Sequence, residues 1–325
     1  PAFDTDYILG AVSCIIWTLT LQTTLKYVLI ALRADNKGEG GILALYTLVR
    51  KRGKRWFSIL AIIGASTLVA DGVITPAITV TSAIEGLHVI SPVVPIVPIV
   101  LTIITAIFFI QRFGTGSIGR YFGPFMLVWF MLLGGLGIVH AVQEPIIFKA
   151  LNPYYAIRLL LQNPSWFMVL GAVFLCTTGA EALYSDLGHC GRKNITAGWT
   201  IVKTMLILNY MGQGAHIIGH SMTYSSPVNP FYAVMPHWMV VPGIIMATGA
   251  AIIASQALIS GCFTIFSDAV HLDFWPMLRF KYPSADKGQI YIPVINGLLF
   301  VLCIITVLLF QSSAHMEAAY GLAIT

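Results

Sequence analysis

Long hydrophobic stretches, separated by short polar segments, follow one another along almost the whole chain. About 20 apolar residues suffice to cross a bilayer as an α-helix, and these stretches are too long for the strands of a membrane barrel. The pattern therefore predicts an all-α polytopic membrane protein with about nine transmembrane helices. The predicted spans lie near residues 7–31, 57–87, 94–111, 121–142, 165–188, 196–218, 238–266, 290–310 and 313–325.

The composition agrees with this class. Of the 325 residues, 57% are hydrophobic and only 10% are charged, whereas soluble domains carry about 25% charged residues. The five cysteines are scattered singly and form no CxxC pair, so we expect buried, unreactive thiols rather than a disulfide framework or a zinc site.

The basic residues gather on one side of the predicted spans. The connections at 32–56, 112–120, 189–195 and 267–289 hold most of them, whereas the opposite connections hold only Lys149 and Arg158. Such an asymmetry places the basic connections in the cytoplasm and segment 143–164 outside the cell. Topology thus accounts for the net charge of +5, and no nucleic-acid partner is expected.

An aspartate lies inside the second predicted span. Asp71 is followed by Thr75 and Thr79 at helical spacing, and Pro76 removes the backbone donor that would serve the carbonyl of Gly72. An acid at the bilayer centre costs about 2.5–3.5 kcal/mol, so it usually faces a polar cavity. A carboxylate, hydroxyls and a freed carbonyl suit a hard cation. The alternative is an Asp71 paired with a lysine for packing.

A second polar segment interrupts the fifth predicted span. In "CTTGAEALYSDLGH" (176–189), a threonine pair and Gly179 precede the acids Glu181 and Asp186. This favours a discontinuous helix whose carbonyl end attracts a cation. An unbroken helix with Glu181 bonded to a neighbour is the other interpretation.

The sequence carries none of the nucleophile, zinc-protease or phosphate-loop motifs, so an enzyme is not expected. It also carries no filter-like run of a potassium channel.

Seven segments stand out, in order along the chain: "RADNKGEGGILALYTL", "ADGVITPAITVTSAIEGL", "TTGAEALYSDLGH", "LNYMGQGA", "ASQALISG", "GQIYIPVIN" and "AAYGLAIT". Together they closely resemble the Kup/HAK/KT potassium uptake family.

This resemblance implies a LeuT-like core of two inverted five-helix repeats. Residues 1–142 would be the remainder of the first repeat, without the family's first helix. Residues 143–164 would form an extracellular connection, and 165–325 would form the second repeat, truncated in its last helix. The chain would then be an internal fragment of a longer protein.

The resemblance also implies a function. We expect potassium uptake across the plasma membrane by alternating access, with K⁺ and H⁺ as substrates and no cofactor. Asp71 and Glu181 are the proton-coupling candidates. The cation-binding residues would be Asp71, Thr75, Thr79, Thr178, Glu181 and Tyr320.

Two other functions stay open at this stage. One is an amino acid or other organic-solute transporter on the same fold, and the other is a potassium uniporter or channel-like protein. The lipid bilayer is the expected surrounding, and a homodimer is compatible with this class of protein.

Overall fold

The computed structural model is all-helical and describes residues 4–36, 39–50, 56–113, 116–185, 187–220, 229–283 and 290–324. The first half comprises α1 (Thr5–Thr18), η1 (Leu19–Ile30), η2 (Ala31–Arg33), α2 (Ile42–Arg50), α3 (Trp56–Glu85), η3 (Gly86–Val89), α4 (Ile96–Ile110), η4 (Gln111–Phe113), α5 (Gly116–Gln143), η5 (Pro145–Leu151) and α6 (Pro153–Gln162). The second half comprises α7 (Trp166–Leu175), α8 (Ala180–Ser185), α9 (Leu187–Cys190), α10 (Arg192–Gly219), α11 (Pro230–Ala233), η6 (His237–Met239), α12 (Val240–His271), α13 (Pro293–Phe310) and α14 (Ser313–Ile324).

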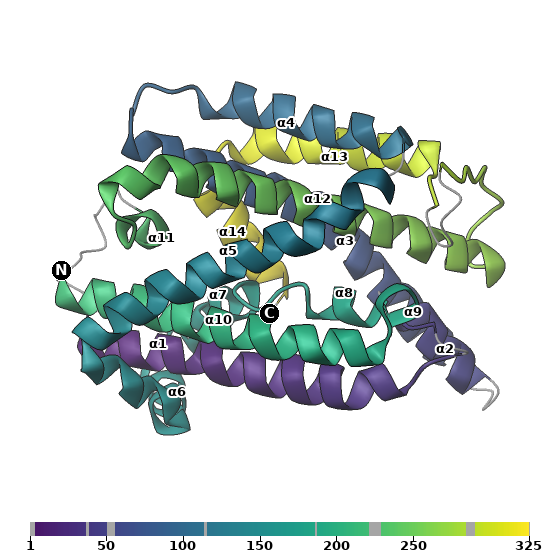
Figure 1. Ribbon diagram of the computed structural model, residues 1–325. Helices are drawn as coiled ribbons and strands as arrows, with labels where there is room; N and C mark the ends of the chain where they lie inside the picture. The colour runs from purple at the N-terminus through teal and green to yellow at the C-terminus, as the bar shows by residue number, and fades with distance from the viewer. Residues whose placement is uncertain are drawn as a thin grey trace.

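The long helices form two packed groups. In one group α3 packs against α4, α12 and α13 around the largest hydrophobic core, and in the other α10 packs against α1 and α5. Figure 1 shows α4, α12 and α13 side by side, with α1 and α10 on the opposite side of the molecule. The short helix α14 contacts both α3 and α7, so it lies where the two candidate polar segments come together.

Helix α10 approaches α5 at two glycines. A Cβ atom on Gly212 would lie 2.3 Å from the Cα of Gly137, so the two backbones touch directly. Close backbone approach through small residues is a common way for membrane helices to associate.

Six helical segments of the described residues are long and apolar enough to cross a membrane. They are Thr5–Arg33, Trp56–Val89, Ile96–Phe113, Tyr121–Gln143, His237–His271 and Pro293–Phe310. Their outer faces expose large apolar side chains, such as Ile63, Val139 and Leu309, which suits contact with lipid. The chain is therefore a polytopic membrane protein.

The expected number of about nine spans is not confirmed over the described ranges. The stretch 165–188 is broken into α7 and α8 with a turn between them. The stretch 196–218 is helical, but it carries Lys203, Asn209 and Gln213 and is less apolar. The last stretch forms only the 12-residue helix α14.

The first span contains an irregularity that the sequence pattern did not predict. Residues Leu19–Ile30 continue α1 as a π-helix. Within it the hydroxyl of Thr24 donates to the carbonyl of Leu19 at 3.1 Å and accepts from the indole N–H of Trp199 at 3.0 Å. Side-chain bonds of this kind offer the backbone an alternative to regular helical pairing.

The cysteines are placed largely as expected. Cys14, Cys262 and Cys303 are buried and Cys176 is half-buried. Cys190 departs from the prediction because it lies exposed at the end of the short helix α9. The division of the chain into two inverted repeats stays a prediction.

Candidate functional site

Asp71 lies in the interior of α3 and is only 4% exposed. Its Oδ1 atom accepts hydrogen bonds from two hydroxyls, that of Thr75 one turn further along α3 and that of Tyr320 on α14. The bond from Tyr320 joins residues that are 249 positions apart in the chain, so the side chain of Asp71 ties α14 to α3.

The second carboxylate oxygen of Asp71 has a different surrounding. Oδ2 is buried, and it accepts no hydrogen bond from any residue that the structure describes. A buried carboxylate oxygen without a donor is costly unless a proton or a cation occupies it. Oδ2 of Asp71 is therefore the position at which a bound proton or cation would remove this cost.

The alternative role of Asp71, packing through an ion pair with lysine, finds no support. Within the described ranges the Asp71 carboxylate forms no ion pair, and the ion pair seen there joins Arg158 and Asp6 at 2.8 Å. A negative group that lacks a fixed positive partner is free to receive a mobile one.

Thr79 and Pro76 contribute less directly. The hydroxyl of Thr79 donates to the carbonyl of Thr75 at 2.8 Å, one turn back on the same helix. Pro76 lies inside α3, which continues through it from Trp56 to Glu85. The structure thus brings Thr75 and Tyr320 to Asp71, whereas the hydroxyl of Thr79 donates to the backbone of its own helix.

The predicted interruption near Gly179 is present. Helix α7 ends at Leu175, residues 176–179 form a turn, and α8 begins at Ala180. Gly179 has φ +93°, in the left-handed region that side chains with a Cβ rarely adopt. The break allows the chain to leave the helical path inside the bundle.

Two threonines stabilise the broken end of α7. The hydroxyls of Thr177 and Thr178 donate to the carbonyl of Phe174 at 3.0 and 3.1 Å, and that of Thr178 also reaches the carbonyl of Leu175. They supply donors to carbonyls that a helix end leaves without intrahelical partners. Thr178 therefore lies at the break, and its hydroxyl donates to the last carbonyls of α7.

Helix α14 lies against this broken segment as well as against α3. The backbone of Gly171 on α7 comes close to Gly321 on α14, next to Tyr320. Tyr210 on α10 donates to the carbonyl of Cys176 at 2.8 Å. The helix that carries Tyr320 thus joins the segment bearing Asp71 to the segment bearing Thr178.

The acids of the second segment are described only in part. The backbone of Glu181 belongs to α8, but its side chain lies outside the described part of the structure, as does the whole of Asp186. Their predicted roles stay predictions.

One contact was missed by sequence reasoning, which did not single out Glu85. Glu85, the last residue of α3, accepts hydrogen bonds from the first residue of α14, Ser313. The signal available was an acid at the end of one apolar stretch and a serine at the start of another.

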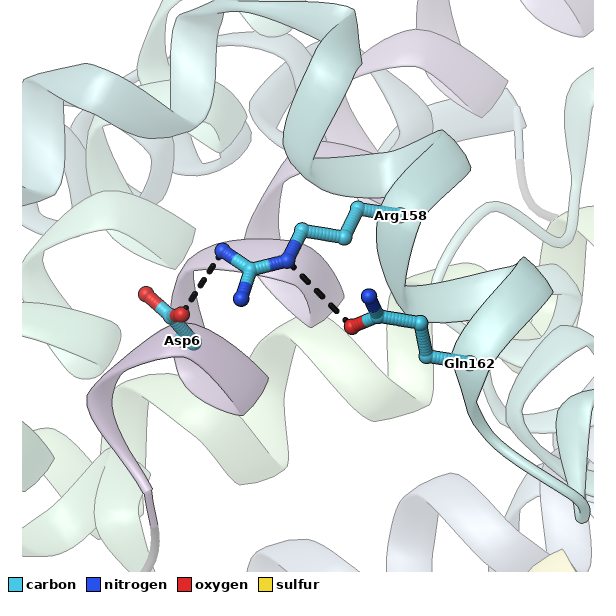
Figure 2. Close-up of polar contacts among 3 residues, drawn as sticks. All are labelled: Asp6, Arg158 and Gln162. Carbon is cyan, nitrogen blue, oxygen red and sulfur yellow. Dashed lines mark hydrogen bonds and ion pairs between the residues drawn. The ribbon is translucent and has the colours of Figure 1, made fainter.

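A cavity of about 290 Å³ lies elsewhere, between α1 and α6. Figure 2 shows its main polar contacts, in which the guanidinium of Arg158 pairs with Asp6 and donates to Gln162 at 3.2 Å. Both charged side chains are more than a third exposed, so solvent weakens their interaction. This cavity does not include any of the predicted cation-binding residues.

The donor set around Asp71 consists of oxygen atoms, and it differs from the residue clusters that usually hold a resident metal ion. Over the described residues no group of three or more His, Cys, Asp or Glu side chains is arranged to hold a metal ion. Carboxylate and hydroxyl oxygens, which are hard ligands, gather at Asp71 instead.

Comparison with known proteins agrees with this chemistry. Residues 2–325 match the family described as "K+ potassium transporter integral membrane domain". A protein of Flavobacterium johnsoniae, described as "Probable potassium transport system protein Kup", is 55% identical over 99% of this chain and 50% of its own length.

Two further relatives carry the same description. The protein of Clostridium perfringens is 54% identical over 98% of this chain, and that of Latilactobacillus sakei is 51% identical over 98%. The chain spans about half the length of these curated relatives.

Proposed function

Because the chain belongs to the K⁺ potassium transporter integral membrane domain family, we propose that it forms the membrane part of a potassium transporter, with K⁺ bound at Asp71. It is a transport protein and not an enzyme. The observation that carries the proposal is the buried Oδ2 atom of Asp71, which lacks a hydrogen-bond donor among the described residues, beside two hydroxyl-bearing side chains.

The proposed ligands whose side chains the structure describes come from α3, from the turn after α7 and from α14. Asp71, Thr75 and Thr79 belong to α3, Thr178 lies at the break after α7, and Tyr320 belongs to α14. A hydroxyl that donates to Asp71 still has lone pairs for a cation. Potassium at this place would be held by oxygens from separate elements of the fold.

We further propose that uptake is coupled to protons and proceeds by alternating access in the plasma membrane. Asp71 supports the first point, because a buried carboxylate can exchange a cation for a proton and remain neutralised. The break between α7 and α8 supports the second, since discontinuous helices are common at the sites of inverted-repeat transporters. Glu181 is the other candidate for the proton, and a LeuT-like fold belongs to the same proposal.

The other transport functions fit the site less well. An amino acid transporter needs a partner for the substrate carboxylate, usually a helix N-terminus, whereas Asp71 presents negative charge. A channel-like path would need no proton exchange, and only measurement of flux separates it from symport. A homodimer is part of the same proposal.

The experiment that tests the site is potassium-limited growth of cells that depend on the full-length protein. Asp71→Asn keeps the shape of the side chain but removes its charge, so we expect growth at limiting potassium to be lost and rescued by high external potassium. Asp6→Asn is the matched control, because Asp6 is an exposed acid paired with Arg158 away from the site. Growth of Asp71→Asn equal to that of the unmodified protein would contradict the role of Asp71.

A further inference from the structure

Helix α14 is hydrogen-bonded to α3 at two places. At the first, which we call the inner contact, Tyr320 donates to Asp71. At the second, which we call the outer contact, Ser313 donates to Glu85. Ser313 and Tyr320 are seven residues apart, which is two helical turns, so both lie on the face of α14 that meets α3. In each case a carboxylate of α3 accepts from a hydroxyl of α14.

The outer contact is a complete pair of hydrogen bonds. Oε1 of Glu85 accepts from the backbone N–H of Ser313 at 2.9 Å, and Oε2 accepts from its hydroxyl. Ser313 is the first residue of α14 and is buried. The first N–H groups of a helix lack intrahelical acceptors, and the helix dipole favours a negative charge there. Glu85 therefore anchors the beginning of α14.

The end of α3 is itself held firmly. The hydroxyl of Tyr232 on α11 donates to the carbonyl of Ala83 at 2.8 Å, and the ring of Tyr232 packs on Gly86. Burial raises the pKa of Tyr232 well above its usual range, so it stays a neutral donor. Tyr232 thus holds in place the end of α3 that carries Glu85, and Glu85 in turn holds the beginning of α14.

We propose that Glu85 is a positioning residue for potassium binding, which holds the first turn of α14 so that the Tyr320 hydroxyl meets Asp71. This inference rests on the proposed function. Helix α14 has only 12 residues, and its described contacts are mainly with α3 and α7. Without the outer contact, α14 would keep its packing on α3 and α7 and the Tyr320 bond, but its first turn would lose the hydrogen bonds from Ser313 to Glu85.

The test is the concentration dependence of rubidium uptake by the full-length protein in proteoliposomes. We expect Glu85→Ala to raise the KM for rubidium by about tenfold with little change in maximal rate, the size expected for lost hydrogen bonds to a charged group. Ser313→Ala, which leaves the charge of Glu85 in place, should raise KM by about threefold, since one of two bonds remains. Glu144→Gln is the control, because this acid lies beside Gly219, beyond α5, and not at α14.

A double variant separates positioning from general stability. In a protein that already carries Tyr320→Phe, Glu85→Ala should raise KM by less than about twofold further, because the hydroxyl that it positions is gone. Full additivity of the two changes would overturn the proposal, and so would an unchanged KM in both Glu85→Ala and Ser313→Ala.

A charge effect is tested separately. Glu317, one turn after Ser313, is half-buried and interacts electrostatically with Glu85. If Glu317→Gln raised KM as much as Glu85→Gln while Ser313→Ala did not, Glu85 would act by attracting cations, and the positioning role would be wrong. Failure of the unmodified protein to take up rubidium would contradict the proposed function instead, so the two failures are distinguishable.

Discussion

The two oxygens of the Asp71 carboxylate differ in what surrounds them. Oδ1 receives the hydroxyls of Thr75 and Tyr320, whereas Oδ2 is buried without a described donor. The first arrangement fixes the orientation of the carboxylate, and the second leaves one oxygen for an exchangeable partner. A cation at such a site would bind without rearrangement of the side chains of Thr75 and Tyr320, which would reduce the cost of binding.

The hydroxyls of α3 are expected to differ in their effect on affinity. Thr75→Val removes a hydrogen bond to a charged group, worth about 1.5–3 kcal/mol, so the KM for rubidium should rise on the order of tenfold. Thr79→Val removes only a bond to the backbone of its own helix, and its effect should be several-fold smaller. Uptake kinetics of the two variants test this, and equal effects would contradict the ranking.

At the scale of the element, the break between α7 and α8 depends on Gly179. Its φ of +93° costs an L-residue conformational strain, and nothing lies within 4 Å of where a Cβ atom would stand. A substitution would therefore act through the backbone and not through a clash. On the α7 side of the break, the hydroxyls of Thr177 and Thr178 donate to the carbonyl of Phe174 and stabilise the helix end.

Gly179→Ala should slow rubidium uptake markedly, because strain of about 1–3 kcal/mol would shift the shape of the break. Gly297→Ala on α13 is the matched control: its Cβ atom would also meet open space, but the residue is helical, where alanine is favoured. Uptake by Gly179→Ala at the rate of the control would show that this backbone conformation is not needed.

At the scale of the whole molecule, the sequence pattern predicted the class of protein and the elements of its site more readily than their contacts. Asp71 was identifiable because an acid inside an apolar stretch is rare, and the break was identifiable from Gly179 and its threonines. The approach of Tyr320 to Asp71 depends on packing across 249 positions, which local spacing does not specify. Tyr320 entered the predicted site only through the family resemblance.

The departures from prediction have physical causes. Helix α10 packs against both α1 and α5, so its polar side chains can be accommodated by protein neighbours as well as by water. Helix α10 therefore does not need to be apolar throughout, and it is not among the six strongly apolar helical segments of the described residues. The π-helical part of the first span involves contacts such as that between Thr24 and Trp199, which hydrophobic periodicity does not encode.

The central claim is that the protein carries potassium through a site at Asp71, and rubidium uptake into proteoliposomes containing the full-length protein tests it most directly. We predict saturable uptake that potassium inhibits, that amino acids leave unchanged, and that rises with an inward proton gradient. Uptake that does not depend on the proton gradient would contradict the proposed proton coupling but not the proposed potassium transport. No uptake under either condition would contradict the account.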